Sequence, residues 1–192
     1  MRALWTPLFL KGRVALVLLA LTVNGFFVRE TLSRVTPQTP HFSDPSIQSE
    51  HEIENFVNQF RKMHGLGELK LDPKMIQMAR SHSLEMRDEH YFSHSSPFTE
   101  NQTPTLRFQK IYSVKDEDDV PFVGENLFWL RDPGYRIEGK EVAEYAENGF
   151  LGDSDYRDNL LDPHFKKMGI GVIRKSVGSE EAQYWVTLNL AN

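Results

Sequence analysis

The order of helix-like and strand-like patterns in residues 50–192 is the feature that most constrains the fold of this chain. In the first half of this region, apolar residues recur at steps of three and four, which is the spacing of one face of a helix. Near the carboxyl terminus, two apolar segments have the length and residue types of strands. Helices that precede a closing pair of strands favour an α+β fold over the alternating units of a doubly wound parallel sheet.

Four helices are predicted from this spacing and from capping residues. The first covers residues 53–63 and ends at the glycines that follow. The helices predicted at 72–90 and 103–112 each open with a capping side chain followed by proline, which fits the first helical position. A fourth apolar face spans residues 138–150. All four should pack on a sheet, since each has only one apolar face.

Three strands are predicted to form that sheet. VGENLFWL, at residues 123–130, has little polar character for its length. The other two are MGIGVIRK, which begins at Met168, and QYWVTLNLA, which begins at Gln183. The turn-like sequence SVGSEE separates them, so we expect an antiparallel pair.

The amino terminus predicts export. Arg2, Lys11 and Arg13 stand in the first 13 residues without any acid, and an apolar run of 15 residues follows at 14–28. This pattern fits a secretory signal peptide, and an uncleaved membrane anchor fits it as well. Residues 29–49 contain three prolines and no apolar periodicity, as linkers do. We therefore expect a signal or anchor at 1–28, a linker at 29–49 and the folded domain at 50–192.

Composition excludes several classes of function. The chain carries a net charge of −5, and residues 50–192 hold 17 basic and 25 acidic side chains, so the folded region is acidic and nucleic acid is not an expected partner. The chain has no cysteine, which excludes disulfides, thiolate metal sites and a cysteine nucleophile. Any metal would be bound by His, Asp or Glu.

Few of the histidines and acids stand out. His82 lies on the apolar face of its helix and is interpreted as a structural histidine in the core. His90 and His94 have the spacing of a zinc pair, but the sequence between them reads as the end of a helix, which disfavours that site. Glu125 lies inside an apolar strand, where a carboxylate needs a cation or hydrogen-bond donors. His94 is one candidate partner.

Five segments, in this order, resemble the bacterial branch of the CAP superfamily, also called SCP-like extracellular domains. They are ARSHSLEM, YFSHSSP, GEN, NGFLGDSDYRDNLLDPHF and MGIGV. The resemblance covers about residues 50–192 and implies a three-layer α-β-α sandwich with a central antiparallel sheet. It also implies a cleft whose floor carries a histidine and a glutamate, which correspond to His94 and Glu125.

The sequence departs from the family pattern at one position of that cleft. Many relatives have a second histidine in a segment similar to SPGHRANIL, and Tyr156 stands at that position here. A phenol is a poor zinc ligand at neutral pH, because its pKa is about 10. The family's second glutamate corresponds to either Glu144 or Glu147, and we carry Glu147 forward. The candidate ligand-binding residues are therefore His94, Glu125, Tyr156 and Glu147.

Three functions follow from this resemblance. The first is an exported or membrane-tethered binding module, not an enzyme, whose cleft takes a lipid, a small apolar ligand or a peptide. The second is a hydrolase, such as a peptidase, with Glu125 as the base and His94 as electrophile or metal ligand. The third is a structural or interaction protein of the cell envelope. No cofactor is expected, and a weakly bound divalent metal on His94 and Glu125 is left open.

Overall fold

The structure is a computed structural model of the whole chain, and residues 44–192 are the ones it describes. The expected signal or anchor at 1–28, and the linker up to residue 43, lie outside the described residues. None of the helices within the described residues is long and apolar enough to cross a membrane.

One four-stranded sheet forms the middle of the domain, in the order β1-β3-β4-β2. β4 (Glu181–Ala191) pairs antiparallel with both β3 (Lys167–Val177) and β2 (Val123–Asp132). The short β1 (Lys70–Leu71) pairs in parallel with β3. The sheet is thus antiparallel apart from β1, and β2 is one of its two edge strands.

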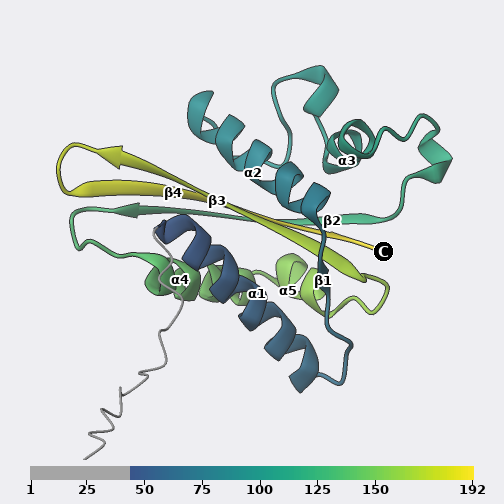
Figure 1. Cartoon of the computed structure of the whole chain (residues 1–192), viewed down its shortest axis with the longest axis horizontal. Coiled ribbons are helices and arrows are strands. Elements are labelled where there is room, and N and C mark those ends of the chain that lie inside the picture. The colour runs from purple at the N-terminus through teal and green to yellow at the C-terminus, as the bar shows by residue number, and fades with distance from the viewer. Residues whose placement is uncertain (1–43) are drawn as a thin grey trace, which may run out of the picture. The chain divides into compact units, whose positions relative to one another are not determined.

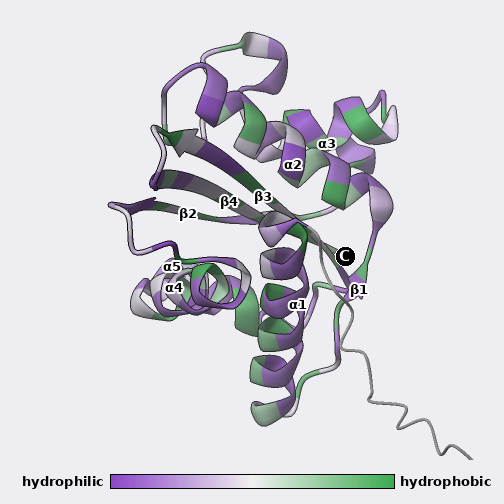
Figure 2. Ribbon diagram, turned by 60° about the vertical axis from the view of Figure 1, so that its left-hand side comes forward, coloured by the Kyte–Doolittle hydropathy of each residue, from purple (hydrophilic) through white to green (hydrophobic). Residues whose placement is uncertain are grey.

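Helices cover both faces of the sheet (Figures 1 and 2). α2 (Pro73–Asp88) and α3 (Pro104–Tyr112) lie on one face. α1 (Pro45–Met63), α4 (Gly139–Gly152) and α5 (Ser154–Leu161) lie on the other. Two single 3-10 turns, Thr99–Asn101 and Glu117–Asp119, flank α3. The predicted α+β fold, a three-layer α-β-α sandwich, is confirmed.

The larger apolar core lies between the sheet and α1, α4 and α5. Its buried side chains come from all three helices and from the strands, and include Ile53, Val57, Val142, Phe150, Leu160, Phe165, Ile170 and Leu188. The α2 face holds two smaller clusters, one around Met75, Met78 and Phe108 and one around Met86, Leu127 and Trp185. Fewer apolar side chains are buried between α2 and the sheet than on the opposite face, and buried polar side chains such as His82 and Glu125 lie among them.

Two glycines let α2 lie directly on β3. A Cβ added at Gly169 would come within 2.0 Å of the Met75 backbone, and one at Gly171 within 2.3 Å of the Arg80 backbone. No side chain fits in that space, so α2 is held at a fixed distance from the sheet. The MGIGV segment therefore positions the helix that carries His82.

The elements agree closely with the sequence prediction, with three differences. α1 begins at Pro45, before the expected domain start at Glu50, because Asp44 caps its first turn. β1 and α5 were not predicted. A strand of two residues has no readable alternation, and α5 has eight residues with a weakly apolar face.

Candidate functional site

Glu125 lies at the centre of a polar cluster on the α2 face of the sheet. The faces alternate along β2: a Cβ at Gly124 would meet Asn159 of α5, the Asn126 side chain accepts from Asn159, and Glu125 points toward α2 and α3. The Glu125 side chain is only 1% exposed. An ionised carboxylate at such a depth must have a partner of opposite charge or several donors.

Arg107 of α3 is that partner. Its Nη2 donates to both carboxylate oxygens of Glu125, at 2.9 and 2.7 Å, and Arg107 itself is buried. Its Nη1 donates to the carbonyls of His94 and Asn101, at 3.1 and 2.7 Å. Arg107 therefore neutralises Glu125 and also fixes the loop that carries His94. Sequence reasoning missed this residue, although it occupies the apolar face of α3 between Pro104 and Phe108.

His94 reaches Glu125 from the loop after α2. Its Nδ1 lies 2.9 Å from Oε1 of Glu125 and its Nε2 lies 3.0 Å from the Tyr156 hydroxyl. Since a carboxylate only accepts, Nδ1 donates to Glu125, and in the tautomer that carries its proton on Nδ1 the Nε2 atom accepts from the phenol. The His94 side chain is 44% exposed, so it is the part of the cluster that solvent reaches.

Tyr156 comes from α5, on the opposite face of the sheet. Asp153 caps α5 by accepting from the Tyr156 backbone N–H, and Asn126 of β2 donates to the Tyr156 carbonyl at 3.0 Å. Burial raises the pKa of the Tyr156 phenol, which keeps the hydroxyl protonated and able to donate. The His94–Tyr156 hydrogen bond thus passes around the free edge of β2 and joins the two helical layers.

Electrostatics keep Glu125 ionised. Burial alone would raise its pKa, but hydrogen bonding to His94 and the charge of Arg107 outweigh it, so the pKa of Glu125 lies below its ordinary value. His82 also lies near, with Nε2 3.8 Å from Oε1 of Glu125, and that nitrogen is 3.1 Å from the Ser93 carbonyl. Burial lowers the pKa of His82, so it is a neutral core histidine, as predicted, and Arg107 supplies the balancing charge.

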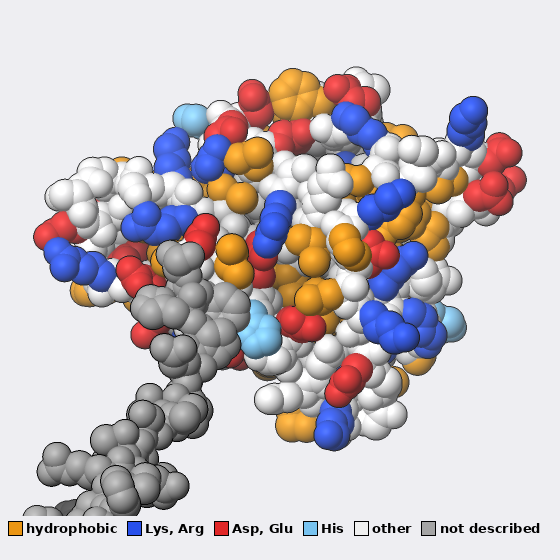
Figure 3. All heavy atoms as spheres, viewed as in Figure 1, with side chains coloured by type: hydrophobic (Ala, Val, Ile, Leu, Met, Phe, Trp, Pro, Cys, Tyr) orange, Lys and Arg blue, Asp and Glu red, His pale blue; other side chains and the backbone are white. Residues whose placement is uncertain are grey.

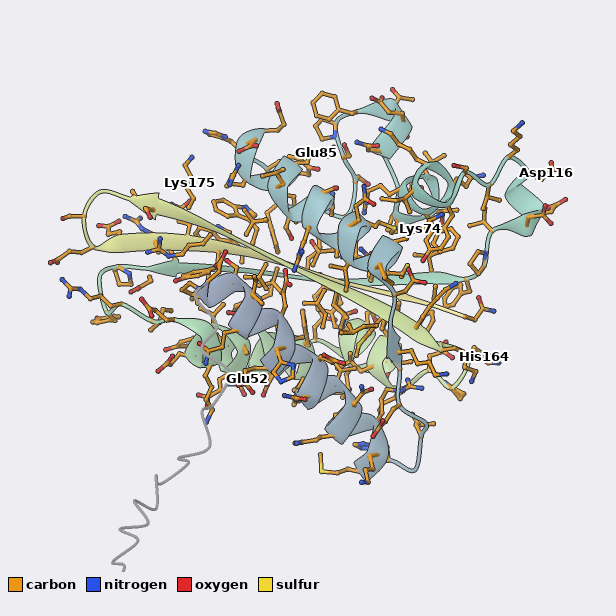
Figure 4. All side chains as sticks on the ribbon, in the orientation of Figure 1. Glu52, Lys74, Glu85, Asp116, His164 and Lys175 are labelled. Atoms are coloured by element: carbon orange, nitrogen blue, oxygen red, sulfur yellow. The ribbon has the colours of Figure 1, made fainter. Side chains whose placement is uncertain are left out.

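Glu147 does not join this cluster. It lies on α4, where its electrostatic neighbours are Glu144, Glu52 of α1 and Lys140 (Figure 4 labels Glu52). Burial, together with these two carboxylates, raises the pKa of Glu147 to about 7. The structure therefore brings together His94, Glu125 and Tyr156 and places Glu147 in a separate acidic region, with Glu144 beside it.

His90 does not pair with His94 either. It is exposed, and its Nδ1 lies 2.8 Å from the Asp88 carbonyl. Its φ of 61° places it in the left-handed region, which ends the chain's helical course after α2. The helix needed for a zinc pair is absent at this point, in agreement with the sequence reading.

A family model described as "CAP: Cysteine-rich secretory protein family" matches residues 54–190. That span is more than half of the chain and contains the whole cluster. The chain belongs to the CAP family.

Two curated relatives of this CAP domain are proteins of Bacillus subtilis. The uncharacterized membrane protein YlbC is 30% identical over 142 residues, which is 71% of this chain and 35% of that protein. The uncharacterized protein YkwD is 26% identical over 133 residues, which is 68% of this chain and 46% of that protein. The chain thus spans less than half the length of either relative.

Solved structures give the same fold. An extracellular protein with an SCP domain from Bacillus anthracis has a TM-score of 0.56 and 26% identity, over 77% of this chain and 41% of that one. An outer surface protein from Borrelia burgdorferi has a TM-score of 0.52 and 16% identity, over 76% of this chain and 94% of that one. An extracellular protein with an SCP domain is therefore among the structural neighbours of this chain.

The donor set of this CAP domain does not fit a divalent metal. Both ring nitrogens of His94 face hydrogen-bond partners, and both oxygens of Glu125 accept from Arg107. A guanidinium already supplies the positive charge that a metal would bring to this carboxylate. Within residues 44–192, no group of three or more ligating side chains is arranged to hold a metal ion.

A cavity of about 380 Å³ lies between α2 and α3, next to the cluster. His82 and Arg107, which both lie near Glu125, form part of its wall. Met78 and Ile111 supply apolar surface, and polar side chains line the remainder: Gln77, Ser81, Glu85, Asn101 and Lys110. Its size falls in the range of small-ligand sites, and it combines apolar walls with fixed polar groups.

Proposed function

We propose that this CAP domain is an exported or membrane-tethered binding module, not an enzyme, and that it binds a small apolar ligand, a lipid chain or a short peptide in the cavity between α2 and α3. The observation that carries the proposal is the contact between Arg107 and both oxygens of Glu125. Through this contact the buried carboxylate of Glu125 holds Arg107 in place, which is a structural role. The same contact fixes one wall of the cavity.

A hydrolase would need Glu125 as a base for water. The side chain is 1% exposed, its oxygens accept from Arg107 and His94, and its pKa is lowered. A general base needs a free oxygen within hydrogen-bond reach of its substrate and a pKa near the working pH. Glu125 meets neither requirement, which favours binding over hydrolysis.

The cavity suits a ligand that is mainly apolar with one polar end. Met78 and Ile111 would contact the apolar part. Lys110, whose Nζ donates to Asn101 at 2.9 Å, lines the same cavity and could meet a carboxylate or carbonyl at the polar end. Fatty acids and short apolar peptides share this chemistry.

Native mass spectrometry of the purified full chain tests the proposal, followed by calorimetric titration with palmitate and with an apolar dipeptide. Ser81→Trp should fill the cavity mouth and abolish binding, since Ser81 is exposed and lines the cavity. Leu84→Trp is the matched control, because Leu84 is exposed on the same helix and is not among the cavity-lining residues. Absence of any retained or titrated ligand would refute the proposal, as would equal binding by both variants.

The enzymatic alternative has its own test. The full chain is incubated with a peptide library and an ester library, in parallel with Glu125→Gln. We expect no turnover by either protein. Turnover that Glu125→Gln abolishes would establish the hydrolase reading in place of ours.

Export is proposed from the amino-terminal pattern and supported by the relatives, one of which is called a membrane protein and another an extracellular protein. Cell fractionation tests it. An anchored chain stays in membranes after a carbonate wash, and a cleaved chain appears outside the cytoplasm without residues 1–28. A full-length chain in the cytoplasm would contradict export.

A further inference from the structure

α2 leaves one end of the sheet uncovered. The helix ends at Asp88, and the left-handed His90 turns the chain away from the strands. Beyond it, the same face of the sheet carries Trp129 and Trp185, which are paired across β2 and β4. Lys175, labelled in Figure 4, lies at this end of β3, past the last turn of α2.

The strand register arranges this end in two rows. Trp129 and Trp185 form an aromatic row. The next row on the same face holds Lys175 and Arg131, paired on either side of Gln183. Trp129 is 42% exposed, and Trp185 is 6% exposed and forms the floor.

A groove of about 380 Å³ follows these rows. Phe92, 48% exposed, and Tyr91 form its aromatic side wall. Four of its eight lining side chains are therefore aromatic. Exposed aromatics in a concave site are uncommon on a soluble domain and mark a contact surface.

The charged side chains that line the groove are all cations. They are Arg87 and Lys175, and no carboxylate is among the lining side chains. Arg87 is held by Asp88, whereas Lys175 forms no direct ion pair among the described residues, although Asp88 lies within electrostatic range. This charge contrasts with the net negative charge of residues 50–192 and selects an anionic occupant. Figure 3 shows Lys/Arg and Asp/Glu side chains interspersed over the face that it presents.

We propose that this groove binds an acidic glycan, a chain of pyranose rings that carry carboxylates. The C–H face of a sugar ring is weakly positive and apolar, so it stacks on the negative face of an indole. Gln183 can donate to and accept from ring hydroxyls, and Lys175 can meet a carboxylate. Trp129 on β2 and Lys175 on β3 lie on either side of β4 and are offset by two residues along the strands, so stacking and charge would act on different rings of one oligosaccharide.

This proposal is independent of the ligand in the cavity between α2 and α3. The two sites share no lining residue. Loss of glycan binding in a variant of the groove should therefore leave palmitate or dipeptide binding unchanged, and Ser81→Trp should leave glycan binding unchanged.

Calorimetric titration of the full chain with an oligogalacturonate tests the proposal, with a dextran oligomer as the uncharged comparison. We expect binding of the oligogalacturonate that Trp129→Ala weakens on the order of tenfold. Lys175→Ala should weaken it about two- to fivefold. Tyr135→Ala and Lys62→Ala are matched controls, because both side chains are exposed and lie outside the groove.

Unfolding curves of each variant keep the result interpretable. Trp129 and Lys175 are exposed, so both variants should unfold at the wild-type temperature; if Trp129→Ala does not, Lys175→Ala alone decides. No binding of the oligogalacturonate, or equal binding by the groove variants and controls, would overturn the proposal. So would groove-dependent binding of phosphatidylglycerol vesicles or of polyglutamate in its place.

Discussion

Glu125 and Glu147 lie on opposite sides of the sheet, and their surroundings shift their pKa values in opposite directions. Glu125 is almost fully buried, yet its pKa is lowered, because Arg107 and His94 contact its oxygens. Glu147 is only half-buried, yet its pKa is raised to about 7, because Glu144 and Glu52 add repulsion to the effect of burial. Burial depth alone therefore does not decide the charge of a carboxylate, because partners of opposite charge can outweigh the effect of burial and like charges add to it.

The largest expected effect comes from removing the cation beside Glu125. Arg107→Met leaves the buried carboxylate without its cation and with His94 as its remaining hydrogen-bond donor, and should lower the free energy of unfolding by about 3–5 kcal/mol, measured by urea denaturation. Lys110→Met, an exposed position on the same helix, should change it by less than about 0.5 kcal/mol.

A double variant sharpens this comparison. Arg107→Met combined with Glu125→Leu removes both charges, so it should be more stable than Arg107→Met alone. If the double variant is as unstable as the sum of the two single variants, the two side chains are not coupled, and the ion pair does not explain the burial of Glu125.

The stability of wild type and of a variant with a neutral side chain at position 125 should depend differently on pH below about 6. Because its pKa is lower in the folded state than the unfolded value of about 4.3, its stabilising contribution is complete above that pH and is lost as pH falls through the folded pKa. One such group adds a slope of at most about 1.4 kcal/mol per pH unit. Urea denaturation between pH 6 and 2 should give a steeper loss for wild type than for Glu125→Gln; equal slopes would contradict the shift.

Removal of the Tyr156 hydroxyl should have a moderate effect on the stability of the domain. Tyr156→Phe removes the hydrogen bond to Nε2 of His94 and should lower the free energy of unfolding by about 0.5–1.5 kcal/mol. Tyr145→Phe is the control, because Tyr145 is exposed on α4. An NMR spectrum that shows no change at the His94 ring in Tyr156→Phe would contradict the contact.

The smallest expected effect comes from a substitution of Glu147, which should raise the free energy of unfolding and not lower it. Its folded pKa of about 7 exceeds the unfolded value of about 4.3, so wild type loses stability as pH rises between these values. Glu147→Gln should remove that loss, with a gain below about 1 kcal/mol at pH 8 and little gain at pH 4, because solvent screens a half-exposed group. Thermal unfolding at both pH values measures it, and a gain larger at pH 4 would reverse our assignment.

Local sequence signals predicted most of the fold. The caps before Pro73 and Pro104 gave two helices at their observed starts, because capping depends on a few adjacent residues. β1 was missed, since its two residues become a strand only by pairing with β3. α1 was placed too late, because its first turn has few apolar residues and depends on Asp44.

The site was predictable only where the family resemblance supplied long-range information. His94, Glu125 and Tyr156 meet although 31 and 62 residues separate His94 from the other two. The need for a cation near Glu125 followed from physics, but its identity as Arg107 required the position of α3. Glu147 was misplaced, because the neighbours of a helical residue depend on how α4 packs against α1.

The position of β2 at the sheet edge has one further consequence. An open edge strand offers unpaired backbone groups to any passing strand, which invites edge-to-edge aggregation. Along residues 125–127 these groups are already engaged: Asn159 donates to the Glu125 carbonyl at 3.5 Å, and the Leu127 backbone hydrogen-bonds the Tyr156 hydroxyl. The Asn159 and Tyr156 side chains therefore also cover part of this edge and hinder strand addition by a second copy of the domain.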